Sequence, residues 1–77
     1  MRDVADVIDQ LIEGVDFTSN ERSRLLAVKE SAYYTAPEAV GRRWAQVRDI
    51  LMLKFAGASE DDKQALRAQR IFNGEEA

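Results

Sequence analysis

The sequence contains no cysteine, no histidine and a single proline in 77 residues. Without cysteine the chain cannot form disulfides or thiolate metal sites, and without histidine it lacks the commonest metal ligand and acid–base side chain. These absences also exclude Ser-His-Asp and Cys-His triads. We therefore predict a protein that is not an enzyme, with no catalytic residues, no cofactor and no bound metal.

Phosphate-binding and calcium-binding loops are also missing. The nearest approach to a glycine-rich phosphate loop is Gly41-Arg42-Arg43, which lacks the required spacing and lies in a predicted helix. The acidic cluster 60–62 lacks the alternating ligands and the glycine of an EF-hand. Acidic residues at the start of a predicted helix are typical of capping, so we assign that role to this cluster.

The length allows one domain, which we place at residues 1–74, followed by a free tail at 75–77. A chain this short buries only about 60% of its unfolded surface, so its core is small. With disulfides and histidine ligands excluded, association with another subunit is the expected source of extra stability. No apolar run approaches the roughly 18 residues of a membrane span, and the N-terminus is too acidic for a signal peptide. We expect a cytoplasmic protein that does not bind membranes or a small-molecule substrate.

Apolar residues recur with helical spacing in four segments, which predicts an all-α, four-helix bundle. The clearest stripe is in the first segment, where apolar residues follow the i, i+3, i+4 pattern. We expect the fourth helix to pack loosely, because it has only three large apolar residues, Leu66, Ile71 and Phe72. The predicted helices span residues 3–14, 19–34, 36–56 and 60–73.

Caps and glycines mark the predicted helix ends. Thr18 with Glu21 has the spacing of a capping box, and Thr35 with Glu38 has the same spacing. Gly14 is predicted to end the first helix in the left-handed conformation. Gly41 lies inside the third helix, where glycine is unfavourable, which indicates a close approach of another element.

The run Ile50-Leu51-Met52-Leu53-Lys54-Phe55 makes the third helix apolar almost all round at its C-terminal end. One interpretation is a central helix that the other three surround. The other is that Met52, with Ile50 or Leu53, forms a binding face, since exposed apolar patches commonly mark interfaces. In the Tyr33-Tyr34 pair, adjacent helical positions point about 100° apart, so we expect one core and one lateral tyrosine.

Charge is unevenly distributed along the chain. Residues 1–21 carry one positive and six negative side chains, a net charge of −5, whereas residues 22–54 carry seven positive and three negative, a net of +4. The two segments could neutralise each other, or the basic middle could attract a partner. The turn between the second and third helices also permits a helix-turn-helix, with the basic 42–48 stretch contacting nucleic acid. The whole chain has a net charge of −3, which disfavours that alternative.

We predict a protein-interaction module, a regulator or inhibitor that binds another protein through the third helix and self-associates, with a helix-turn-helix nucleic-acid binder as the alternative. Trp44 could equally belong to the core. The predicted partner-binding residues are Tyr34, Arg42, Arg43, Trp44, Arg48, Met52 and Phe55.

Overall fold

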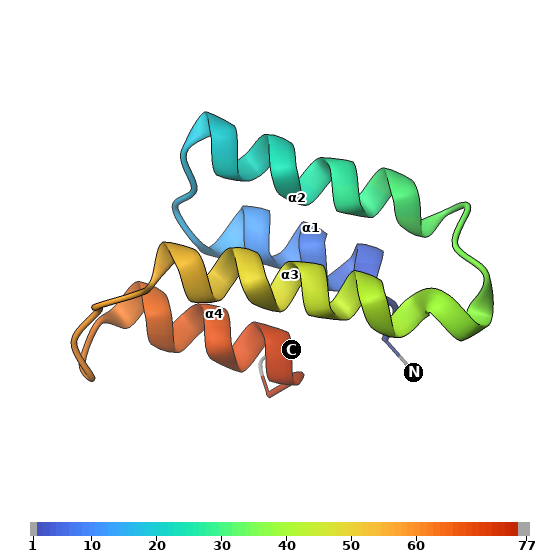
Figure 1. The fold of residues 1–77 in the computed structure, drawn as a ribbon. Coiled ribbons are helices and arrows are strands. Elements are labelled where there is room, and N and C mark those ends of the chain that lie inside the picture. Colours follow the sequence, from blue (N-terminus) through green and yellow to red (C-terminus); the bar gives the residue numbers. More distant parts are fainter. Residues whose placement is uncertain (1, 76–77) are drawn as a thin grey trace.

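The computed structural model describes residues 2–75, which form helices joined by turns and loops (Figure 1). The predicted all-α bundle of four helices is confirmed. The helices are α1 (Val4–Gly14), α2 (Ser19–Ala32), α3 (Val40–Lys54) and α4 (Lys63–Asn73), with a short 3-10 helix, η1 (Pro37–Ala39), leading into α3.

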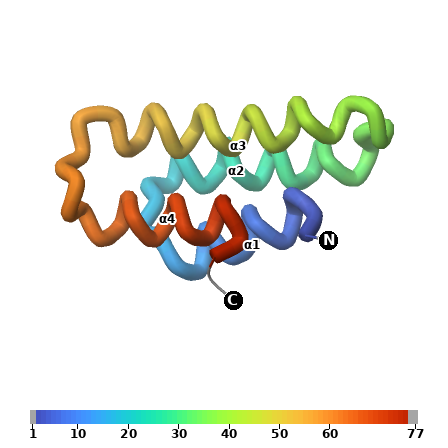
Figure 2. Tube along the Cα trace, turned by 90° about the horizontal axis from the view of Figure 1, so that it is seen from below, coloured from blue at the N-terminus to red at the C-terminus, as the bar shows by residue number. Residues whose placement is uncertain are grey.

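Helix α1 lies against both α2 and α4, and α3 runs antiparallel along α2 (Figures 1 and 2). The connection from α1 to α2 is short, whereas the chain makes a wider loop between α3 and α4 (Figure 2). Helices α3 and α4 thus dock mainly on different neighbours, α2 and α1 respectively. Because α3 and α4 dock on different neighbours, the surface between these two helices stays open.

The core forms around the apolar stripe of α1. Val7, Ile8 and Leu11 have no exposed surface, as the helical spacing predicted. The other helices each contribute a few side chains to the same cluster. The buried residues are Val4, Val7, Ile8, Leu11, Val15, Phe17, Leu25, Val28, Val47, Leu51, Ala68 and Ile71.

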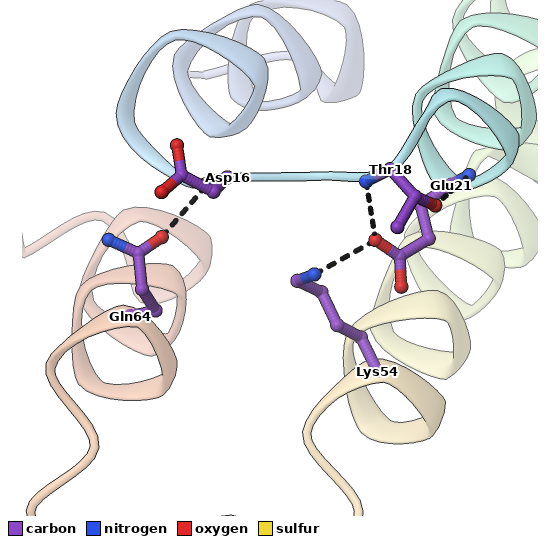
Figure 3. A network of polar contacts seen from close by, with 5 residues as sticks. All are labelled: Asp16, Thr18, Glu21, Lys54 and Gln64. Atoms are coloured by element: carbon purple, nitrogen blue, oxygen red, sulfur yellow. Dashed lines mark hydrogen bonds and ion pairs between the residues drawn. The ribbon is translucent and has the colours of Figure 1, made fainter.

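The capping box predicted at the start of α2 is present. The amide of Glu21 donates to Thr18 Oγ1 at 3.2 Å, and the amide of Thr18 donates to Glu21 Oε1 at 2.8 Å. Glu21 Oε1 also accepts a hydrogen bond from Lys54 Nζ at 2.8 Å, which ties the end of α3 to the start of α2 (Figure 3). In the same loop, the amide of Asp16 donates to Gln64 Oε1 of α4 at 2.7 Å (Figure 3). The α1–α2 loop therefore holds α3 and α4 as well.

The second predicted capping box, Thr35 with Glu38, is wrong. Thr35 Oγ1 donates back to the carbonyl of Ser31 at 2.7 Å, and it accepts from Arg43 Nε at 2.9 Å. Because the threonine is used at the end of α2, α3 begins after η1 without a side-chain cap. The motif has the right spacing, but the Thr35 hydroxyl accepts from Arg43 and donates to Ser31 instead of accepting from the Glu38 amide.

The predictions for two glycines are also wrong. Gly14 remains helical, and α1 ends on the extended Val15. Gly41 has open space around it, with no atom within 4 Å of an added Cβ. The close approach instead occurs at Gly14, where an added Cβ would lie 3.1 Å from Ile71 Cδ1.

Helix α4 has well-formed ends. Asp62 caps its start by accepting from the amides of Gln64 and Ala65, and Gly74 ends it at φ 79° as predicted. The amide of Glu75 donates to the carbonyl of Arg70 at 2.8 Å, which completes a Schellman motif. Residues 76–77 of the predicted free tail lie outside the described residues.

Helix α4 is attached chiefly on one side. Ala68 and Ile71 are buried in the core shared with α1. Arg2 strengthens the attachment, since its guanidinium donates to the carbonyls of Ile71 and Phe72 at 2.7 and 2.8 Å. The side of α4 toward α3 is packed less closely, and an open groove remains between these two helices.

Candidate interaction groove

An open, mainly apolar groove of about 260 Å³ lies between α3 and α4. It exists because α3 packs on α2 while α4 packs on α1, so that the two helices leave a gap where their side chains face each other. The groove is lined by Arg48, Leu51, Met52 and Phe55 of α3 and its end, and by Ala65, Ala68, Gln69 and Phe72 of α4.

Two aromatic rings connect α3 and α4 beside the groove, and one of them, Phe72, also lines it. Trp44 of α3 meets Phe72 of α4 edge-to-face, with ring centroids 5.7 Å apart. The guanidinium of Arg2 lies over the Trp44 ring, 5.4 Å from its centre. Aromatic pairs in this geometry are favourable beyond the area they bury. The pair therefore provides a direct contact between α3 and α4.

The walls are suited to an apolar ligand with a polar edge. Met52 is 64% exposed, and Phe55 and Phe72 are half-buried, so a ligand in the groove would cover their remaining apolar surface. Arg48 and Gln69 are exposed and supply the polar groups. Methionine side chains adapt to many apolar shapes, which suits a docking surface rather than a rigid small-molecule site.

Four of the seven predicted site residues meet at this groove. Arg48, Met52 and Phe55 line it, and Trp44 contacts the lining residue Phe72. Trp44 is half-buried and packs against the core cluster, so it belongs in part to the core.

The remaining three predicted residues lie elsewhere. Tyr34 is 86% exposed in the turn after α2. Arg43 Nε donates to Thr35 Oγ1 in the connection after α2, and its Nη1 donates to Gln46 Oε1 at 2.9 Å. Arg42 is exposed on α3 and does not line the groove. The three residues therefore do not form one surface with Met52.

The expectation of one core tyrosine is wrong, since Tyr33 is 69% exposed and Tyr34 is more exposed still. Helix α2 ends at Ala32, so the tyrosines lie in the turn that follows it rather than on a helix face. Tyr33 borders a smaller hollow of about 140 Å³ at the N-terminal end of α1. That hollow is bounded by Asp3, Val4, Ala5, Ala32, Tyr33, Thr35, Val40 and Arg43.

Sequence reasoning missed the α4 wall of the groove. The sequence pattern identifies Phe72 as an apolar residue of the fourth helix, but it does not assign Phe72 to a binding site. The signal was available in part, because Ala65, Ala68 and Phe72 recur at helical spacing and form one face with little bulk. Which helix this face would meet depends on the packing of α4 on α1, and the spacing alone does not give that.

No family model, no curated protein and no solved structure matches this chain. Within residues 2–75, no helix is both long and apolar enough to cross a membrane. The same part of the chain holds no group of three acidic side chains placed to bind a metal ion.

Proposed function

We propose that this chain is a non-enzymatic protein-interaction module that binds an apolar helical segment of another protein in the groove between α3 and α4. The observation that carries the proposal is the exposure of Met52 in an apolar groove that Leu51, Phe55 and Phe72 continue inward. Regulation or inhibition of the partner, in the cytoplasm, is the role we propose for such a small binding protein.

A helix is the ligand that this shape favours. The groove runs between two helices whose side chains present ridges and gaps, and a third helix can fill such a gap by ridge-into-groove packing. Helix-in-groove recognition typically anchors two or three apolar residues one turn apart. Arg48 at the edge would favour a partner helix that carries an acidic residue beside its apolar stripe.

Two adjacent residues of α3 provide a matched test. Met52 and Leu53 are 64% and 68% exposed, but only Met52 lines the groove. Tagged wild-type protein, Met52→Glu and Leu53→Glu would be used to capture proteins from a lysate of the source organism, with and without nuclease. We expect one dominant protein that survives nuclease, persists with Leu53→Glu and is lost with Met52→Glu. Capture that does not depend on Met52 would overturn the proposal.

The arrangement of α2 and α3 does not favour the helix-turn-helix alternative. The two helices lie side by side and antiparallel (Figure 1), whereas the helices of that motif cross steeply. The lysate experiment still addresses it: a nucleic-acid binder would recover material that nuclease removes. Its binding would fall steeply with salt and with the double change Arg42→Ala and Arg43→Ala.

A further inference from the structure

The smaller hollow lies at the end of the bundle where α1 and α3 begin and α2 ends (Figure 1). It shares no lining residue with the groove between α3 and α4. Half of its lining residues are aliphatic, and of these Val4 is buried while Ala5 and Ala32 are half-buried. The fourth, Val40, is 37% exposed. A recessed apolar surface between three helices is therefore open to solvent here.

Arg43 is the cation of this hollow, and its guanidinium is held in place. Its Nε donates to Thr35 Oγ1 and its Nη1 donates to Gln46 Oε1, both at 2.9 Å. Thr35 is anchored in turn, because its hydroxyl donates to the carbonyl of Ser31 at 2.7 Å. The arginine is also half-buried. A guanidinium that is already ordered loses little conformational freedom when it binds an anion.

The same guanidinium has unused donors and an unpaired charge. Within residues 2–75, its Nη2 group donates no hydrogen bond and no carboxylate forms an ion pair with Arg43. Asp3 also lines the hollow, but its Oδ1 caps α1 by accepting from the amides of Ala5 and Asp6. A half-buried cation beside apolar surface is best matched by a carboxylate, which accepts two parallel hydrogen bonds from a guanidinium.

The size of the hollow limits what it can hold. Its volume is about 140 Å³. Pockets that enclose a whole drug-sized ligand measure about 300 to 1,000 Å³, so this hollow takes one small apolar group and not a ligand of that size. Tyr33 borders it at 69% exposure, and the next residue, Tyr34, is 86% exposed. Exposed tyrosines provide contact area at low cost in conformational entropy, which suits a chain that continues outward from the hollow.

We propose that this hollow binds the C-terminal residue of another polypeptide, one with an aliphatic side chain such as valine or leucine. The side chain fills the hollow, and the terminal carboxylate accepts hydrogen bonds from Nη2 of Arg43. Asp3 Oδ2, which accepts no hydrogen bond within residues 2–75, is the acceptor for the backbone amide of the bound residue. The preceding residues of the partner lie across Tyr33 and Tyr34. The site does not depend on the proposed use of the groove, because the two share no residue.

A pair of synthetic peptides tests the terminal carboxylate. Acetyl-Ala-Gly-Leu with a free carboxylate would be titrated into labelled protein and followed by proton–nitrogen correlation NMR, beside the same peptide ending in a carboxamide. We expect the free acid to shift the backbone resonances of the residues around the hollow, including Ala5, Tyr33 and Val40. The carboxamide should bind about tenfold more weakly or worse, because hydrogen bonds to charged groups are the stronger ones.

Three variants test the site in the protein. Arg43→Gln should weaken binding of the free acid about tenfold or more, because the carboxylate loses its charged donor. Ala5→Leu keeps the arginine but fills the hollow, so it should abolish binding. Arg24→Gln removes an exposed arginine of α2 that lines neither the hollow nor the groove, and it should have no effect. Circular dichroism would establish that each variant is folded.

Several outcomes would overturn the proposal. These are the absence of any shift at millimolar peptide, equal binding of acid and carboxamide, and wild-type binding by folded Arg43→Gln or Ala5→Leu protein. Shifts centred on Met52, Gln69 and Phe72 would place the peptide in the groove instead. Free leucine, titrated separately, should bind more weakly than the peptide, since it makes no contact with the tyrosines. Equal or tighter binding of free leucine would show a site for an amino acid and not for a polypeptide end.

Discussion

Lys54 Nζ lies 2.8 Å from Glu21 Oε1, the same carboxylate oxygen that accepts the amide of Thr18 (Figure 3). The ammonium group also lies 5.2 Å from the centre of the Phe17 ring and 5.5 Å from that of Phe55. One lysine thus connects the cap of α2, the end of α3 and two aromatic side chains. This connection holds the end of α3 against the start of α2, next to Phe55 of the groove.

Replacing Lys54 with methionine should lower the free energy of unfolding by about 1 to 2 kcal/mol, because the charged hydrogen bond is lost while Glu21 stays partly buried. Lys54→Arg keeps the charge and should lose less. Urea unfolding followed by circular dichroism measures both changes. Lys29→Met is a matched control, because Lys29 also pairs at 2.7 Å, but with the half-exposed Asp9. Equal losses for the two methionine variants would contradict this interpretation.

Acid should weaken the cap of α2. The hydrogen bond from Lys54, followed by that from the Thr18 amide, lowers the pKa of the Glu21 carboxyl below its ordinary value of 4.5. A lowered folded-state pKa means that this carboxyl stabilises the protein above pH 4.5, and that the contribution disappears as the pH falls through the folded-state value.

The pKa of Lys29 is raised by its hydrogen bond to Asp9, so the stabilisation from this pair is present below pH 10.5 and lost in stronger alkali.

The pH dependence can be assigned by comparing the wild type with Glu21→Gln. The difference in unfolding free energy between the two should shrink as the pH falls from 6 toward 3, a range of about three units chosen to span the carboxyl titration. A difference that stays constant over this range would show that the Glu21 carboxyl titrates alike in the folded and unfolded chains.

Arg2 should hold the end of α4 in place. Its guanidinium donates to two carbonyls at the end of that helix and lies over the Trp44 ring, which contacts Phe72 of α4. We expect Arg2→Ala to speed amide hydrogen exchange in α4 much more than in α2. Arg2→Lys should recover little, because a lysine ammonium does not reproduce the two-pronged donation of the guanidinium. Uniform acceleration across all helices would indicate a global loss of stability instead.

Much of the fold could be predicted from local patterns. The stripe of α1, the capping box at Thr18 and the end of α4 at Gly74 each depend on residues close in sequence, and each is as predicted. The site could be predicted only on its α3 side, where the excess of apolar residues around Met52 shows in the sequence. Its α4 side depends on which neighbours α3 and α4 choose, and that choice is made by contacts between residues far apart in the chain, such as Asp16 with Gln64.

Gly41 and Gly14 both lie in helices, but only an added Cβ at Gly14 would meet residues from a distant part of the chain. Gly41→Ala should raise the free energy of unfolding by about 0.5 to 1 kcal/mol, because alanine favours the helix and the added methyl meets no atom. Gly14→Ala gains the same helical preference, but its Cβ would lie 2.9 Å from Arg67 Nε and 3.1 Å from Ile71 Cδ1. The arginine can move aside, whereas Ile71 is buried between α1 and α4, so we expect no gain or a net loss. Thermal unfolding of the two variants compares them directly, and an equal gain at both positions would mean that α4 does not pack closely on α1 at Gly14.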